Sequence, residues 1–182
     1  MSDKIAEGSL YFERLSEEHA SFLTCFDNRE TDLVDFLRED ALKNQKIFIS
    51  TTFVAFIGSP DRKLVGYITL LADSVRIRES EELELRFKDK GIGYSYLPAL
   101  KIGRMAVDEK FQGKGIGKSI IQFAIGIVEK MNALVGCRFL TVDAKTGARG
   151  FYEKIGFKVL VEKPNSPSPM FLDFSDNQNK LK

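Results

Sequence analysis

The chain of 182 residues has only two cysteines, one histidine and no tryptophan. Cys25 and Cys137 lie far apart and form no CxxC pair, so together with a single histidine they offer too few soft ligands for a structural zinc site. We therefore expect no metal ion in the protein. Sparse, unpaired cysteines also favour the reducing cytoplasm as its compartment.

A strong charge of either sign and long apolar runs are absent as well. Lysine and arginine number 27 and aspartate and glutamate 26, which leaves a net charge of +1 and no global attraction to nucleic acid or membrane. No stretch reaches the ~18 uncharged apolar residues of a membrane span. The segment Met1 to Tyr11 carries Asp3 and Glu7 where a signal peptide has an apolar core. We expect a soluble protein that is not exported.

The chain does have enough apolar material for one core. Its hydrophobic content is 43%, with 15 phenylalanines, and its length is typical of one domain. We predict a single domain over residues 1–175, followed by a polar tail, 176–182, that has little to bury.

Hydrophobic periodicity predicts a mixed α/β fold. Strand-like composition is found at residues 10–15, 47–57, 64–75, 100–107, 139–144, 157–162 and 170–174. Helical spacing of apolar residues predicts helices after Ser16, from Thr31 to about Gln45, at 116–131 and at 146–155. The charged segment 78–96 is predicted to hold at most one short helix, and 164–169 to form a loop.

The most informative motif is the loop Gln112-Gly113-Lys114-Gly115-Ile116-Gly117, which follows a strand and opens an amphipathic helix. Unpaired N–H groups and the positive dipole end make such a helix start an anion site. Lys114 and Lys118 stand where a bare helix would favour acidic residues, which indicates a bound anion. The alternatives are a solvated glycine turn, a P-loop that would need glycine at 112, and a dinucleotide fingerprint, GxGxxG, where this loop is GxGxG.

With the strand 101–107 before it and the segment Phe151 to Phe157 after it, this Q-x-x-G-x-G core resembles the GNAT N-acetyltransferases over roughly residues 10–174. The resemblance implies a six- or seven-stranded mixed, mostly antiparallel sheet that is splayed at its centre and flanked by about four helices. It also implies acetyl-CoA as acyl donor. The cofactor-binding residues that it implies are Met105, Ala106, Val107, Gln112, Gly113, Lys114, Gly115, Ile116, Gly117 and Lys118.

A narrower resemblance is to TacT-type toxins, which acetylate the α-amine of aminoacyl-tRNA. It rests on Phe26-Asp27, on Leu33 to Leu37 and on Gly103 to Asp108, whereas Asp27-Asn28-Arg29 departs from the Cys/Ser-Gly usual after the Phe in that group. This resemblance implies tRNA as acceptor, with an antitoxin and a second copy of the chain as partners. Small amines and protein N-termini stay open as acceptors, and a non-catalytic acyl-CoA sensor stays open as an alternative function.

Two residues are candidates for the chemistry of acyl transfer. The resemblance puts the backbone N–H of Val107 beside the thioester, where it would hold the carbonyl oxygen. Tyr152 would protonate the departing thiolate, because Phe151 and Ile155, at i and i+4, are expected to share a buried helix face that turns Tyr152 toward the cofactor. The alternative for Tyr152 is an ordinary packed aromatic residue.

A general base is missing from this set. The strand 101–107 has no acidic side chain, Asp108 and Glu109 come only at its end, and His19 is expected at the surface. An acceptor α-amine, with a pKa of ~7.7, is therefore favoured over a lysine amine of ~10.4. Arg104 either pairs with an acidic neighbour or contacts phosphate in the acceptor site.

Overall fold

The structure, a computed structural model, describes residues 10–162 and 167–177. The predictions for the N-terminal segment before Leu10, for loop residues 164–166 and for tail residues 178–182 lie outside the described residues. The chain groups into two compact units, which are described separately. The first comprises Met1–Leu71 and Gly103–Ala124, and the second Ala72–Ile102 and Ile125–Lys182.

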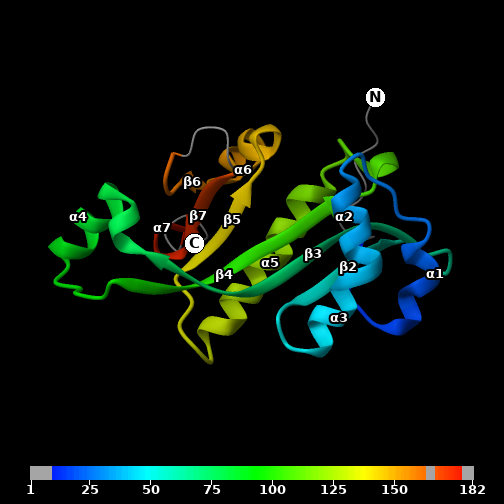
Figure 1. Ribbon diagram of the computed structural model, residues 1–182, viewed down its shortest axis with the longest axis horizontal. Helices are drawn as coiled ribbons and strands as arrows, with labels where there is room; N and C mark the ends of the chain where they lie inside the picture. The colour runs from blue at the N-terminus through cyan, green and yellow to red at the C-terminus, as the bar shows by residue number, and fades with distance from the viewer. Residues whose placement is uncertain (1–9, 163–166, 178–182) are drawn as a thin grey trace. The chain divides into compact units, whose positions relative to one another are not determined.

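Seven strands form one sheet in the order β1-β2-β3-β4-β5-β7-β6 (Figure 1). They are β1 Leu10–Arg14, β2 Thr51–Ile57, β3 Lys63–Arg76, β4 Tyr96–Val107, β5 Phe139–Ala144, β6 Lys158–Val159 and β7 Ser168–Asp173. β1 with β2, β2 with β3, β5 with β7 and β6 with β7 pair antiparallel. β4 and β5 pair in parallel over four residue pairs, from Ala99↔Phe139 to Ile102↔Val142. The predicted mixed, mostly antiparallel sheet is confirmed.

The helices follow the predicted order, and Thr31 to Lys46 form one continuous helical segment with a π-helical turn, η3, in its middle. They are α1 Ala20–Leu23, α2 Thr31–Asp35, η3 Phe36–Asp40, α3 Ala41–Lys46, α4 Glu81–Asp89, α5 Ile116–Asn132, α6 Arg149–Ile155 and α7 Phe174–Asn177. Short 3₁₀ turns are η2 Glu17–His19, η4 Ile77–Glu79, η5 Glu109–Phe111 and η6 Thr146–Ala148. Within the described ranges, no helix combines the length and apolarity needed to cross a bilayer.

The first unit is built around one core of strand and helix residues. Figure 1 shows α1, α2 and α3 together beside β2. Phe26, Leu37, Val54 and Tyr67 are fully or almost fully buried in this core. On β3, Gly66 leaves room for α5, since a Cβ there would lie 2.8 Å from Ile120 Cδ1 and 2.9 Å from the Ala106 carbonyl oxygen. The absence of a side chain at this position allows α5 to lie close to the sheet.

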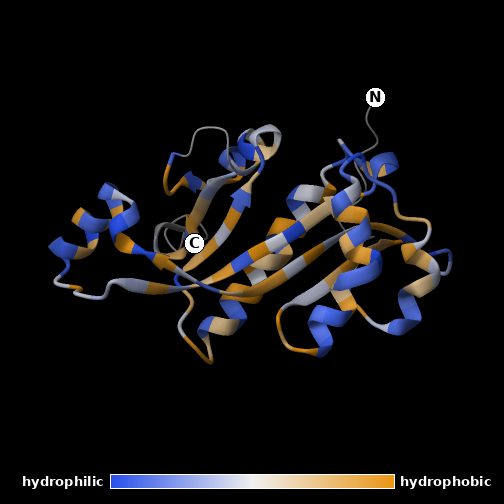
Figure 2. Cartoon of the chain, viewed as in Figure 1, coloured by the Kyte–Doolittle hydropathy of each residue, from blue (hydrophilic) through white to orange (hydrophobic). Residues whose placement is uncertain are grey.

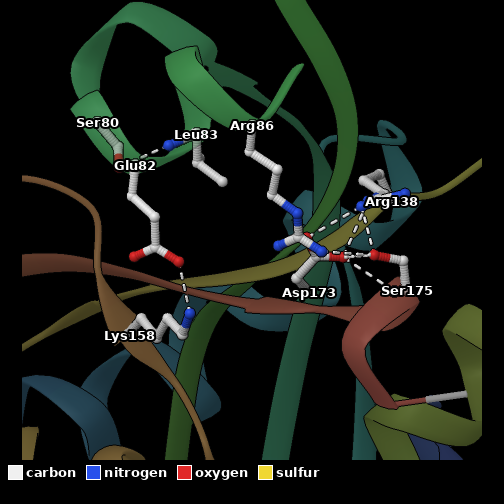
Figure 3. Close-up of polar contacts among 8 residues, drawn as sticks. All are labelled: Ser80, Glu82, Leu83, Arg86, Arg138, Lys158, Asp173 and Ser175. Atoms are coloured by element: carbon white, nitrogen blue, oxygen red, sulfur yellow. Dashed lines mark hydrogen bonds and ion pairs between the residues drawn. The ribbon is translucent and has the colours of Figure 1, made fainter. Parts of the chain in front are cut away.

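In the second unit, polar contacts attach α4 to β7 and to α7 (Figure 3). The side chain of Asp173 is 3% exposed, and its Oδ2 accepts from Arg86 Nη1 at 3.0 Å and from Arg138 Nη2 at 3.1 Å. Its Oδ1 accepts from the backbone N–H of Ser175 at 2.9 Å. Arg138 Nε lies 2.9 Å from Oδ1 in an ionic contact without hydrogen-bond geometry. One buried carboxylate thus contacts two guanidinium groups.

Two predicted strands are shorter than expected. Residues 47–50 are not part of β2, because the end of α3 continues into a hydrogen-bonded turn there. Of residues 157–162, only Lys158–Val159 form β6. Leu160 N–H still donates to the Pro169 carbonyl oxygen at 2.8 Å, but a proline has no N–H to return the bond, so the ladder ends. In contrast, β4 begins at Tyr96, earlier than the predicted residue 100.

Candidate functional site

The glycine loop opens α5 in the first unit. Gly113 and Gly115 have φ of 75° and 86°, a left-handed conformation that glycine adopts without steric cost. A Cβ at either position would meet no atom within 4 Å, so the space above this backbone is open. The helix begins at Ile116, whose N–H and those of the next two residues have no intrahelical acceptor. The loop therefore presents backbone donors to an open surface.

The charges around the loop suit an anion. The first turn of α5 contains no acidic residue. Lys114 and Lys118 are exposed, and neither has a carboxylate partner in the described ranges. Lys114 Nζ lies 5.3 Å from the centre of the Phe111 ring. Open space, free N–H groups and two unneutralised lysines fit the pyrophosphate of a coenzyme A ester.

The backbone N–H of Val107 points away from β3. The next residue, Asp108, donates its N–H to the Val65 carbonyl oxygen on β3 at 2.9 Å, and successive N–H groups along a strand point to opposite sides. Val107 also lies outside the register that β4 shares with β5. Two other predicted cofactor residues lie on β4. The side chain of Ala106 is buried in the core, so only its backbone can contact a ligand, and the side chain of Met105 is partly buried.

A group of contacts that the sequence did not predict fixes the end of β4. Asn28 Nδ2 donates to the Val107 carbonyl oxygen at 2.8 Å, and Gln112 Nε2 donates to the same oxygen at 3.2 Å. Asp108 Oδ2 accepts from the Asp27 N–H at 3.0 Å. Local turn-capping patterns were present at two of these residues: Asp108 Oδ1 accepts the Lys110 N–H at 3.0 Å, and Asn28 Oδ1 accepts the Glu30 N–H at 2.9 Å. These contacts position the strand end from which the glycine loop departs.

Tyr152 lies in the second unit, and the predicted orientation of its helix is wrong. The tyrosine is buried, at 6% exposure, whereas Phe151 and Ile155 are only partly buried. The ring packs against Phe157, with ring centroids 5.3 Å apart, where the chain turns back after Gly156 at φ 108°. Burial raises the pKa of the Tyr152 phenol to about 12. Its hydroxyl has no hydrogen-bond partner among the described residues.

The candidate bases are all engaged in other contacts. Both oxygens of Asp108, which is 3% exposed, accept backbone N–H groups, and Glu109 Oε1 lies 2.6 Å from Arg29 Nε. The prediction that His19 lies at the surface is wrong. The residue is only 5% exposed, because its side chain closes the N-terminal turn of η2. Its Nδ1 accepts the Ser16 N–H at 3.0 Å and its Nε2 lies 2.8 Å from Glu13 Oε2.

Arg104 is exposed on β4. Its Nη1 donates to the Gly103 carbonyl oxygen at 2.9 Å, and its guanidinium lies 5.4 Å from the centre of the Phe36 ring. In the part of the chain that the structure describes it has no carboxylate partner. The ion pair considered as one alternative is therefore not formed with these residues, and a phosphate contact stays a prediction.

Known acetyltransferases are similar to this chain in sequence and in fold. The sequence matches the family described as Acetyltransferase (GNAT) domain over residues 49–159. A tRNA-acetylating toxin of Mycobacterium tuberculosis is 28% identical over 158 residues, which cover 86% of this chain and 89% of the toxin. The structure of AtaT complexed with acetyl-methionyl-tRNAfMet has a TM-score of 0.82 at 25% identity, covering 95% of this chain and 99% of AtaT.

A structure of a mutant AtaT toxin bound to the C-terminus of the antitoxin AtaR and acetyl-CoA shares the fold, with a TM-score of 0.76 at 23% identity. It covers 96% of this chain and 99% of that one. The family match spans well over half of the sequence and includes β4, the glycine loop and α6. The chain therefore belongs to the GNAT acetyltransferase family and is an acetyl-CoA-dependent N-acetyltransferase.

Proposed function

We propose that the acceptor is the α-amine of an aminoacyl-tRNA. The observation that carries this proposal is the engagement of Asp108, Glu109 and His19 in structural contacts, which leaves none of these three candidates free as a general base. An amine must be neutral to attack, and an α-amine with a pKa of ~7.7 is substantially neutral at cellular pH without help. The similarity to a tRNA-acetylating toxin and to AtaT supports the same acceptor.

The glycine loop, the two lysines, Val107 and Tyr152 have separate roles in this reaction. The N–H groups of the glycine loop, together with Lys114 and Lys118, hold the pyrophosphate, and the Val107 N–H donates to the acyl oxygen. Acetyl-CoA supplies the activated acetyl group: the N–C bond forms, the C–S bond breaks, and the proton lost by the amine leaves to solvent. Tyr152 holds the proton that the sulfur leaving group takes up.

Partners and compartment follow from this acceptor. We propose the cytoplasm, where charged tRNA is used, and the free thiols of Cys25 and Cys137 are compatible with it. The structural similarity to a toxin bound to its antitoxin supports a protein antitoxin as a further partner of this chain.

The acceptor is tested by comparing initial rates on charged tRNA, charged tRNA with a blocked amine, a polyamine and a lysine peptide, with products identified by mass spectrometry. We expect acetylation of charged tRNA with a free amine. Protein contacts to tRNA phosphates release bound counterions, so the affinity for tRNA falls as salt rises. If the protein neutralises three phosphates, its affinity for tRNA should fall by roughly 20-fold between ~50 and ~200 mM salt. Salt-insensitive acetylation of the peptide or polyamine, with charged tRNA unmodified, would exclude this acceptor but not the acetyltransferase activity.

Cofactor binding is tested at Gly115. A valine there must leave φ 86° or accept a left-handed conformation that costs an L-residue about 1–2 kcal/mol, so we expect acetyl-CoA affinity to fall by roughly 5–30-fold or more in calorimetry. Gly91→Val is the matched control, since Gly91 has φ 68° and equally open surroundings but lies in the other unit. Equal affinities of the two variants would remove the loop from the acetyl-CoA site.

A further inference from the structure

The connection between α1 and α2 contains the segment Asp27-Asn28-Arg29, which departs from the Cys/Ser-Gly usual in TacT-type toxins. Figure 2 shows this connection in the hydrophilic colour where it approaches α2. Asn28 is nevertheless buried, at 8% exposure, while Asp27 and Arg29 on either side of it are exposed. A buried amide has to be hydrogen-bonded, so the partners of Asn28 indicate what it does.

Both ends of the Asn28 amide are bonded to backbone groups, and these partners fix its orientation. Its Oδ1 accepts the Glu30 N–H at 2.9 Å, and its Nδ2 donates to the Val107 carbonyl oxygen at 2.8 Å. A backbone N–H can only donate and a carbonyl oxygen can only accept, so the amide cannot be flipped. Position 28 therefore requires one acceptor and one donor from a single planar group. Aspartate has the same size but no donor when it is ionised.

The Val107 carbonyl depends on these side-chain donors. Val107 is the last residue of β4, and β5 does not pair with β4 at this level. The carbonyl oxygen instead accepts from Asn28 and, at the longer distance of 3.2 Å, from Gln112 Nε2. The N–H of Asp108, in the same peptide group, donates to the Val65 carbonyl oxygen. Both polar groups of the peptide between residues 107 and 108 are thus held, which fixes its plane at the end of the strand.

Fixing this peptide also sets the direction of the Val107 N–H. In an extended residue, the N–H and the C=O of that residue point to the same side of the strand. The carbonyl held by Asn28 and the N–H therefore both point away from β3. An unbonded carbonyl on this side would turn the negative end of its dipole toward the charge that develops on an acyl oxygen. The amide donors of Asn28 and Gln112 offset that partial charge.

We propose that Asn28 is a positioning residue for acyl transfer, acting through the Val107 peptide. This role rests on the proposed function, in which the Val107 N–H donates to the acyl oxygen. The chain beyond β4 is held by bonds that do not involve the Asn28 side chain, since Asp108 accepts the N–H groups of Asp27 and Lys110. Loss of the Asn28 amide should therefore misdirect the donor and leave the pyrophosphate site in place.

The first test separates turnover from acetyl-CoA binding. Asn28→Asp keeps the size of the side chain and the bond to Glu30, but places an oxygen against the Val107 carbonyl oxygen. Since a displacement of about 1 Å can cost ~10²-fold in rate, we expect kcat for charged tRNA to fall by roughly 10- to 100-fold, with acetyl-CoA affinity in calorimetry within about twofold of wild type. Asn28→Ala removes the donor without adding repulsion, so its kcat should fall less.

Asn132→Asp is the matched control. The Asn132 amide also joins two backbone groups, because its Nδ2 donates to the Cys137 carbonyl oxygen at 2.9 Å and its Oδ1 accepts the Cys137 N–H at 2.8 Å. Asn132 belongs to the second unit, whereas the glycine loop belongs to the first. This variant should lose stability, as Asn28→Asp does, but keep the wild-type kcat. Equal losses of kcat in the two variants would assign Asn28 to stability alone and overturn the proposal.

The second test observes Val107 directly and contains no acceptor, so its result does not depend on which amine is acetylated. In amide NMR spectra of the wild-type chain, the Val107 N–H should shift on binding acetyl-CoA and much less on binding free CoA, which has no acyl oxygen. In Asn28→Asp with acetyl-CoA bound, this difference should be lost. A difference retained in the variant would overturn the proposal alone. A wild-type Val107 N–H that responds equally to both ligands would overturn the role of Val107 together with the proposal.

Discussion

Replacing Asp173 by asparagine is expected to lower the free energy of unfolding by about 3 kcal/mol, a fall in melting temperature of roughly 6–12 °C for a chain of this size. The variant keeps the shape of the side chain but leaves Arg86 and Arg138 facing an amide without a negative charge. The value is at the lower end of the range for buried pairs, because both arginine side chains are about a quarter exposed, at 23% and 26%. Thermal unfolding measures the melting temperature of the variant, and urea unfolding measures its free energy of unfolding.

Asp143→Asn provides the control for this prediction. Asp143 also pairs with a cation, Lys101 at 2.6 Å, but its side chain is 51% exposed, and exposed pairs contribute about 0–1 kcal/mol. Its melting temperature should stay close to that of the wild type. If the two variants lose equal stability, burial does not explain the role of Asp173.

Replacing Tyr152 by phenylalanine is expected to reduce turnover by about 10²-fold, the usual contribution of general acid catalysis, while acetyl-CoA affinity is retained. Burial raises the pKa of this phenol to about 12, so it stays protonated, and able to donate, up to about pH 11. Full transfer to a thiolate whose thiol has a pKa of ~8.5 is uphill by about 5 kcal/mol, so the phenol acts as a donor that stabilises the departing sulfur rather than by complete loss of its proton beforehand. Turnover should therefore show no loss from Tyr152 ionisation below that pH.

Tyr67→Phe is the matched control, and the two substitutions should have opposite consequences. The Tyr67 hydroxyl donates to the Leu33 carbonyl oxygen at 2.7 Å in the core, so its loss should cost about 1 kcal/mol of stability and leave turnover nearly unchanged. The Tyr152 hydroxyl makes no such bond with residues 10–162 or 167–177, so its removal should leave the melting temperature nearly unchanged. Wild-type turnover in Tyr152→Phe would assign this residue to packing.

Features encoded in short segments were predictable from the sequence. The strand at 139–144 is β5 to the residue, and the helical spacing from Thr31 gives the α2–η3–α3 segment. The glycine loop was recognised because strand, glycines, lysines and amphipathic helix are contiguous. In each case the pattern repeats within a few residues, which is the range over which periodicity carries information.

Features that depend on contacts between distant segments were not predictable. Asn28 and Val107 are 79 residues apart, and nothing near either residue indicates the other. The prediction for the orientation of Tyr152 was wrong because several residues of α6 are apolar. Only the packing against Phe157 determines that Tyr152 is the buried one of them. Residues 47–49 have strand-like composition, but the hydrogen bonds that end α3 determine their conformation.

The same long separation has a consequence for the timing of folding during synthesis. Asp27, Asn28 and Arg29 bond to residues 79 to 81 positions later in the chain. At ~5–20 residues per second, Asn28 waits roughly 4–16 s on the ribosome before the Val107 carbonyl is made. The end of β4 and the glycine loop that departs from it therefore acquire their final arrangement late, after the helices of residues 20–46 have emerged. An unfinished chain that stops before β4 has neither the anchored strand end nor the donors for a pyrophosphate.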